Sequence, residues 1–223
     1  MKKYSAELIG TFALVLAGAG AGCLLNDHRA DHPELMGLVT VALAHGLTLA
    51  GMIYALGHIS GGHFNPAVSV AMRVTGKIGN CDMAGYIIAQ LIGAALAGFM
   101  LELLFHSGVP SGYLGATVLA DKINPSVGLL CEGVGTFLFF IVIFGAAVDG
   151  RTAGNMAGLA IGLILAGLIM CFGPLTGASF NPARTFGPAL ASGHWNDFWI
   201  YIVGPVVGGS LAGLLQTKFF MKS

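Results

Sequence analysis

The chain has 223 residues, and only 9% of them are charged, with ten lysines and arginines against ten aspartates and glutamates. A soluble domain carries about 25% charged residues, so a chain with 56% hydrophobic residues cannot cover itself with a charged surface. The apolar content excludes disorder, and the formal net charge of zero offers no basic face for nucleic acid. We therefore expect an all-α membrane protein.

Uncharged stretches long enough to cross a bilayer recur along the chain, and about 20 apolar residues suffice for one helix. They predict six membrane-spanning helices, near residues 5–25, 36–57, 83–105, 127–148, 154–172 and 197–218. Most lysines and arginines fall on one side of these spans, and positive loops mark the cytoplasmic side. We expect a multi-pass protein of the cell membrane with both termini in the cytoplasm.

Two uncharged stretches are too long for one membrane span and too short for two spans with a loop. Glu34 and Arg73 enclose 38 uncharged residues, and Arg151 and Arg184 enclose 32. Each stretch ends in a glycine-rich turn and an Asn-Pro pair, at residues 57–66 and 173–182. Irregular backbone survives at membrane depth only where it is buried in protein or lines a watery cavity. Each stretch is therefore predicted to be a span followed by a re-entrant half-helix, and the pair implies a cavity.

The two halves of the chain resemble each other. Residues 6–12 parallel residues 131–137, and the Phe-Asn-Pro-Ala of residues 64–67 recurs at 180–183. Each half holds three spans, an odd number, so the second half must be inverted relative to the first. We expect one membrane domain over residues 1–223, with repeat 1 at about 1–106 and repeat 2 at about 127–223. Small residues such as Gly93 and Gly208 predict close helix packing.

The two Asn-Pro-Ala motifs predict the starts of the half-helices, because Asn is a favoured N-cap and Pro is favoured at the first helical position. A capping Asn uses its side-chain oxygen on the free N–H groups of the helix, which leaves its NH2 group to donate outward. Two such donors, backed by the positive ends of two helices, orient water and repel cations. Two ordinary turns are the alternative. The motif residues are Asn65, Pro66, Ala67, Asn181, Pro182 and Ala183.

Backbone carbonyls and one arginine complete the predicted pathway. Glycine lets the backbone approach a lumen closely, so the turns are predicted to offer the carbonyls of Gly61, Gly62, His63, Phe64, Gly177, Ala178, Ser179 and Phe180. Arg184 follows Asn181 by three residues, on the same helix face. A charge at membrane depth costs at least ~2.5 kcal/mol, so Arg184 is predicted to line the pore; a side chain that snorkels to the surface is the alternative.

Glu7 and Glu132 are the acidic residues well inside predicted spans, and they occupy equivalent positions of the repeat. An unpaired buried carboxylate is costly, so we expect both to accept hydrogen bonds from the re-entrant backbones; a catalytic role is the alternative. His45 lies in mid-span, as a hydrogen-bonded core residue or as a pore-lining one. The four cysteines show no metal-ligand spacing, so no metal, no cofactor and no enzyme activity are expected.

The segments "SGGHFNPAVS" and "GASFNPARTFGP", within a six-span inverted repeat, resemble the aquaporin (major intrinsic protein) family. The resemblance covers nearly the whole chain and implies a homotetramer with one pore per subunit. It also implies a constriction formed by His45, Ile169, Ala178 and Arg184. Glycerol-conducting members carry Asp after this arginine, whereas this chain has Thr185, which resembles the water-conducting branch.

The residues and the resemblance together predict a passive channel for water. The His/Ile/Ala/Arg set is similar to that of plant vacuolar and archaeal members, which implies passage of ammonia, hydrogen peroxide or urea as well. Protons and ions are expected to be excluded. A glycerol-type facilitator is the alternative, and an inverted-repeat secondary transporter is disfavoured because the spans hold few charges with which to build a coupling site.

Overall fold

The computed structural model describes residues 1–27, 34–105, 112–152 and 154–221, and the regular elements in these ranges are all helices. The α-helices are α1 (Lys2–Asp27), α2 (Glu34–Ser60), α3 (Pro66–Val74), α4 (Asn80–Phe105), α5 (Pro125–Ile143), α6 (Ala157–Thr176), α7 (Pro182–Ser192) and α8 (Ile200–Leu215). Wider π-helical turns extend α5 over Phe144–Val148 and α8 over Gln216–Phe220. Six helices are long and apolar enough to cross a membrane, so the predicted all-α membrane fold is confirmed.

The half-helices α3 and α7 begin where the Asn-Pro motifs predict, but the helices before them run further than expected. Spans predicted to end at residues 57 and 172 continue to Ser60 and Thr176. The carbonyls of Gly57 and Gly173 accept from the N–H groups of Gly61 and Gly177 in the ordinary helical pattern, which closes these extra turns. The irregular segments shrink to residues 61–65 and 177–181 as a result.

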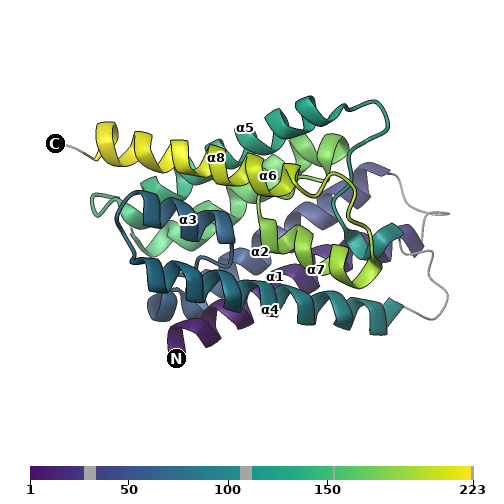
Figure 1. Ribbon diagram of the computed structural model, residues 1–223, viewed down its shortest axis with the longest axis horizontal. Coiled ribbons are helices and arrows are strands. Elements are labelled where there is room, and N and C mark those ends of the chain that lie inside the picture. The colour runs from purple at the N-terminus through teal and green to yellow at the C-terminus, as the bar shows by residue number, and fades with distance from the viewer. Residues whose placement is uncertain (28–33, 106–111, 153, 222–223) are drawn as a thin grey trace.

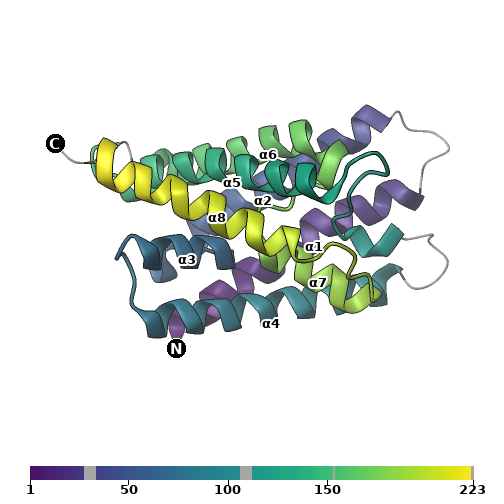
Figure 2. The same cartoon turned by 45° about the horizontal axis from the view of Figure 1, so that its top comes forward.

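The helices pair in the same way in the two halves of the chain. Helix α1 packs against α2 and α4, and α5 packs in the same manner against α6 and α8, while α2 and α6 pack together. Each half-helix crosses to the other half, since α3 packs on α8 and α7 packs on α4. Figures 1 and 2 show α3 and α7 pointing away from each other from a common centre. This arrangement brings both Asn-Pro motifs to the middle of the bundle.

The start of α1 and the end of α8 lie at the same end of the bundle, which Figure 1 shows on the left. Helix α7 extends toward the opposite end. Glycines allow the helices to approach this closely: a Cβ atom on Gly93 would lie 2.3 Å from the carbonyl oxygen of Leu8, and one on Gly208 would lie 2.1 Å from that of Gly133. Both contacts join the first and third spans of one half, so the close packing predicted at these positions is present.

Candidate functional site

Two asparagines begin the half-helices at the centre of the bundle. Asn65 and Asn181 have extended backbones, with φ of −157° and −154°, and a proline follows each of them. The side-chain oxygen of Asn65 accepts from the N–H of Ala67 at 2.9 Å, and that of Asn181 accepts from the N–H of Ala183 at 3.0 Å. Each Asn is therefore an N-cap that satisfies the free end of its helix.

The two caps also bind each other's loops. The amide Nδ2 of Asn65 donates to the carbonyl of Phe180, and that of Asn181 donates to the carbonyl of Phe64, both at 2.9 Å. These two carbonyls were predicted to face permeating molecules, but both are engaged by the opposite asparagine, and both phenylalanines are fully buried. Each asparagine NH2 carries two hydrogens, so one remains on each side chain after the cross-link forms.

The loops before the asparagines share one backbone pattern. Their first, second and fourth residues have positive φ, at Gly61, Gly62 and Phe64 in one loop and at Gly177, Ala178 and Phe180 in the other. Left-handed backbone costs little at glycine but roughly 1–2 kcal/mol at other residues. Ala178 takes this conformation with a φ of 46° where the first loop has glycine. The strain is held by the hydrogen bonds that each loop makes to a buried carboxylate.

Glu7 and Glu132 supply those bonds. The carboxylate of Glu7 accepts from the N–H groups of His63 and Phe64 at 2.9 and 2.7 Å. The carboxylate of Glu132 accepts from the equivalent N–H groups of Ser179 and Phe180, at 3.0 and 2.8 Å. Both glutamates are fully buried. A carboxylate is an acceptor with two oxygens, which suits it to collect successive N–H groups of a loop that has no helix or strand to pair with.

Further donors to the glutamates come from residues that the sequence did not single out. Ser60 donates to Glu7 at 2.6 Å, and Thr176 donates to Glu132 at 2.7 Å, each from the last turn of the preceding helix. Gln90 of α4 donates to Glu7 at 2.8 Å. The two hydroxyl donors could have been predicted from the sequence, because Ser60 and Thr176 occupy equivalent positions of the repeat. Gln90 has Pro205 at the equivalent position, so no repeat signal marked it.

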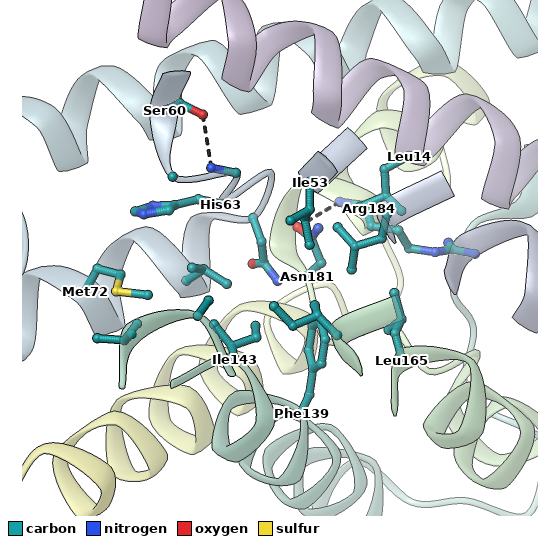
Figure 3. A pocket seen from close by; sticks show the side chains of 18 of the residues that line it. Leu14, Ile53, Ser60, His63, Met72, Phe139, Ile143, Leu165, Asn181 and Arg184 are labelled. Carbon is teal, nitrogen blue, oxygen red and sulfur yellow. Dashed lines mark hydrogen bonds between the residues drawn. The ribbon is translucent and has the colours of Figure 1, made fainter. Parts of the chain in front are cut away.

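A cavity of about 410 Å³ reaches into the bundle past these loops. Figure 3 shows His63, Asn181 and Arg184 along one side of it and Phe139, Ile143 and Leu165 on the facing side. The facing side is apolar, and the side that carries the polar groups also includes the apolar side chains of Leu14 and Ile53. Of the predicted pore residues, the cavity is lined by His45, Gly61, Gly62, His63, Asn65, Ser179, Asn181 and Arg184.

A pair of buried polar side chains, His45 and Arg184, belongs to the lining of the cavity. The Nε of Arg184 donates to Nε2 of His45 at 3.2 Å, and its Nη1 donates to the carbonyl of Gly115 at 2.7 Å. Nδ1 of His45 lies 2.8 Å from the carbonyl of Val41. A carbonyl can only accept, so the proton of His45 is on Nδ1 and Nε2 is the acceptor for the arginine. The guanidinium is held to one wall by two partners.

Other predicted residues are not among those that line the cavity. Ile169 and Ala178 are 2% and 1% exposed, and neither is among the residues that line the 410 Å³ space. The same holds for Gly177 and for the motif residues Pro66, Ala67, Pro182 and Ala183. Gly115, in contrast, was not predicted at all. It lies in a segment between spans whose sequence carries no motif, and only the folded chain brings it to Arg184.

A helical bundle of membrane-crossing length, with polar backbone exposed to an internal cavity at its centre, defines a membrane channel. The sequence matches the description "Major intrinsic protein" over residues 1–216. Aquaporin TIP4-4 of Zea mays is 44% identical over 220 residues, which covers 97% of this chain and 85% of that protein. Aquaporin AqpM of Methanothermobacter thermautotrophicus is 44% identical over 233 residues, covering 96% and 95%.

Among solved structures, that of the aquaglyceroporin from Plasmodium falciparum matches with a TM-score of 0.87 and 25% sequence identity, covering 98% of this chain and 96% of the other. The chain thus belongs to the major intrinsic protein family, whose members are channels and not enzymes. It is an aquaporin-family channel.

Proposed function

We propose that residues 1–223 form one passive pore for water, through which small neutral solutes such as ammonia, hydrogen peroxide or urea also pass. The observation that carries the proposal is the reciprocal bonding of Asn65 and Asn181, each of which donates to the loop before the other. Each retains one N–H, and both stand at helix N-termini. A water molecule that meets two donors turns its oxygen toward them. Its hydrogens then point away, which interrupts a proton-conducting chain of water.

Arg184 supplies the second barrier, against cations. Guanidinium has five N–H donors, and its bonds to His45 and Gly115 use two of them. The remaining donors serve a passing polar molecule, while the positive charge, 95% buried, repels cations. Ile169 and Ala178 are proposed as the apolar side of this filter, and the carbonyls of Gly61, Gly62, His63 and Ser179 as the acceptors along the wall of the cavity.

The solute range rests on the geometry of His45 and on the relatives. Nε2 of His45 accepts from the arginine and draws it toward α2, which supports a filter wide enough for more than water. Relatives from plants, archaea and mouse are named aquaporins, whereas one solved relative is named an aquaglyceroporin. Thr185 follows the filter arginine here, in place of the Asp typical of glycerol-conducting members. Glycerol conduction is therefore the second candidate.

We also propose a homotetramer in the cell membrane, with both termini in the cytoplasm. Large apolar side chains remain exposed on the bundle, such as Leu103 at 75%, Leu130 at 64% and Leu47 at 59%. These surfaces fit lipid or a neighbouring subunit. The basic residues Lys3, Arg73 and Arg151 belong to the end of the bundle that holds the termini, in agreement with the positive-inside rule.

The test is stopped-flow permeability of proteoliposomes, against protein-free vesicles, with sucrose and then glycerol, urea or ammonia gradients. We expect fast water flow and slow glycerol entry; glycerol entry at a rate approaching that of water would overturn the water channel. Asn181→Asp keeps the cap oxygen and removes the NH2 donor, so proton leak should rise. Asn124→Asp is the matched control, because Asn124 caps α5 before a proline but lies outside the pore.

A further inference from the structure

The segment of residues 112–123 meets α7 at two adjacent side chains. The carbonyl of Gly115 accepts from Arg184 at 2.7 Å. Two residues further, the hydroxyl of Thr117 lies 2.8 Å from that of Thr185. Thr117 and Thr185 are 2% and 3% exposed, so water does not compete for this contact. The segment and the start of α7 are therefore joined by two neighbouring hydrogen bonds, one of which involves the filter arginine.

The proton positions in this contact follow from the bonds beyond it. Ser179 Oγ lies 2.8 Å from the carbonyl of Asn181, which can only accept, so Ser179 donates there. Ser179 and Thr185 are 2.6 Å apart, and since the hydrogen of Ser179 is already used, Thr185 must donate to Ser179. The Thr117 hydroxyl neighbours both Tyr201 and Thr185. Because the hydrogen of Thr185 is used on Ser179, the contact between the two threonines requires Thr117 to donate to Thr185. Three hydroxyls form a one-way chain from the 112–123 segment to the carbonyl of the pore asparagine.

The same segment has little room to move as long as these bonds hold. A Cβ atom on Gly115 would lie 2.4 Å from the carbonyl oxygen of Ala19 in α1, and one on Gly177 would lie 3.0 Å from Cα of Thr117. The N–H of Ala120 donates to the carbonyl of Leu175 at 3.0 Å. The segment is thus wedged between α1 and the second re-entrant loop. Through the Thr117 hydroxyl, the segment makes a side-chain hydrogen bond to Thr185 on α7, the helix that carries Arg184.

We propose that Thr117 is a positioning residue for the filter: through Thr185 it holds the Gly115 carbonyl against Arg184 and keeps the guanidinium on the wall of the pore. This inference rests on the proposed function. When the hydroxyl bond is lost, the segment stays packed against α1, but the Gly115 carbonyl is no longer aligned by Thr117 and its bond to Nη1 of Arg184 weakens. The guanidinium, still tied to His45 on one side, then turns its free N–H groups into the lumen, where they bind water and obstruct the path.

The experiment compares Thr117→Val, which keeps the shape and removes the hydroxyl, with Thr117→Ser, which keeps the hydroxyl. We expect the valine variant to conduct water about five-fold more slowly. One ordinary hydrogen bond changes the ratio of two conformations by about this factor, here the arginine held on the wall and the arginine turned into the lumen. The serine variant should restore the wild-type rate. Thr217→Val is the matched control, because the bonds of the Thr217 hydroxyl among the described residues go to the carbonyls of Gly213 and Leu214, within α8 and its extension. It should leave the rate unchanged.

A merely structural role is separated by repeating Thr117→Val in an Arg184→Val background. If Thr117 acts through Arg184, the threonine replacement has no further effect there. The assignment would be overturned if Thr117→Val lowered the water permeability of Arg184→Val by the same factor as that of the wild type. It would also be overturned if Thr117→Val alone conducted water at the wild-type rate. Should Thr117→Val not fold, Thr185→Val and Thr117→Ala test the same bond, and failure of all three to fold would also overturn it, since the bond would then maintain the fold itself. Wild-type permeability over empty vesicles tests the proposed function separately.

Discussion

Replacement of Glu132 by glutamine is expected to destabilise the protein more than the same replacement at Glu7. Both glutamates hold a re-entrant loop, so both variants exchange one acceptor oxygen for an NH2 group that faces N–H donors. In Glu132→Gln, the least harmful orientation of the new amide places its NH2 group against the N–H of Phe180. In the wild type this N–H donates to a carboxylate oxygen at 2.8 Å. One charge-assisted hydrogen bond is lost, and the new NH2 finds no acceptor in the contacts of this carboxylate.

Glu7 has a neighbour that can compensate. Gln90 donates through Nε2 to Glu7, while its Oε1 is buried and has no partner among the described residues. A half-turn of this amide would present Oε1 to the new NH2 group. Ser69 also accepts from Nε2 of Gln90 at 3.0 Å, and the half-turn gives up that bond, since the Ser69 hydrogen is already donated to the carbonyl of Asn65 at 3.4 Å. Glu7 thus has a spare amide acceptor on a side chain that already contacts its carboxylate, whereas no amide side chain contacts Glu132 among the described residues.

The magnitudes follow from the number of bonds. Loss of a hydrogen bond to a charged group costs about 1.5–3 kcal/mol, and an unpaired buried donor about 1–3 kcal/mol. We expect Glu132→Gln to lower the free energy of unfolding by about 3 kcal/mol and Glu7→Gln by about 2 kcal/mol. For a chain of this size 1 kcal/mol corresponds to about 2–4 °C. The unfolding temperatures should fall by about 6–12 °C and 4–8 °C respectively.

Thermal unfolding of the purified channel in detergent, followed by the loss of the folded peak in size-exclusion chromatography, measures both shifts. Glu102→Gln is the control, because no hydrogen bond or ion pair of Glu102 is found among the described residues of α4; it should unfold with the wild type. Glu7→Gln/Gln90→Leu removes the spare acceptor and should unfold at or below the temperature of Glu132→Gln. An unchanged unfolding temperature for Glu132→Gln would refute the reasoning, since the carboxyl would then be protonated and already resemble an amide.

Four further outcomes are expected. Arg184→Val removes the donors to His45 and Gly115 together with the charge, so cation leak in an ion-flux assay should rise; unchanged selectivity would contradict the filter role. Ala178→Gly relieves a left-handed backbone at φ 46° and should raise stability by about 1 kcal/mol, with faster urea entry; a lower unfolding temperature would argue against the strain. Gly135→Ala places a Cβ 2.2 Å from the ring of Phe180 and should cost about 1–3 kcal/mol, whereas Gly167→Ala, with open space around it, should not destabilise. Hydrogen bonds from Arg151 lower the pKa of Asp149 from 3.8 to about 2, so its stabilisation is complete above pH 4 and disappears as the pH falls toward 2. The difference in unfolding temperature between wild type and Asp149→Asn should be constant from pH 8 to 5 and shrink at pH 3, and a change between pH 8 and 5 would exclude this pair as its source.

Local chemistry made much of the fold predictable. Hydropathy and the spacing of charges located the six spans, because the bilayer demands long apolar helices regardless of what packs on them. The capping of α3 and α7 was predictable for a similar reason, since Asn65 and Asn181 bond to N–H groups two and three residues away. The repeat then related Glu7 to Glu132 before any contact was known.

Sequence patterns misled where a distant residue decides a local structure. Gly57 and Gly173 look like helix ends, because glycine is typical after the last turn. The helices nevertheless continue to Ser60 and Thr176, whose hydroxyls donate to carboxylates on α1 and α5. The carbonyls of Phe180 and Phe64 accept from Asn65 and Asn181, and these contacts span 115 and 117 positions of the sequence, so no local pattern predicts them.

Six spans and two capped half-helices could therefore be predicted from the order of residues, because spans and caps depend on neighbours a few residues away. The contacts that hold the filter could not be predicted in this way and became visible in the folded chain. Gly115, Thr117 and Gln90 lie far along the chain from Arg184, Thr185 and Glu7, and no periodicity or spacing links them. Their contacts exist because two inverted halves interlock, each half-helix packing on the other half, and that packing leaves a buried arginine and a buried carboxylate to find their partners in space.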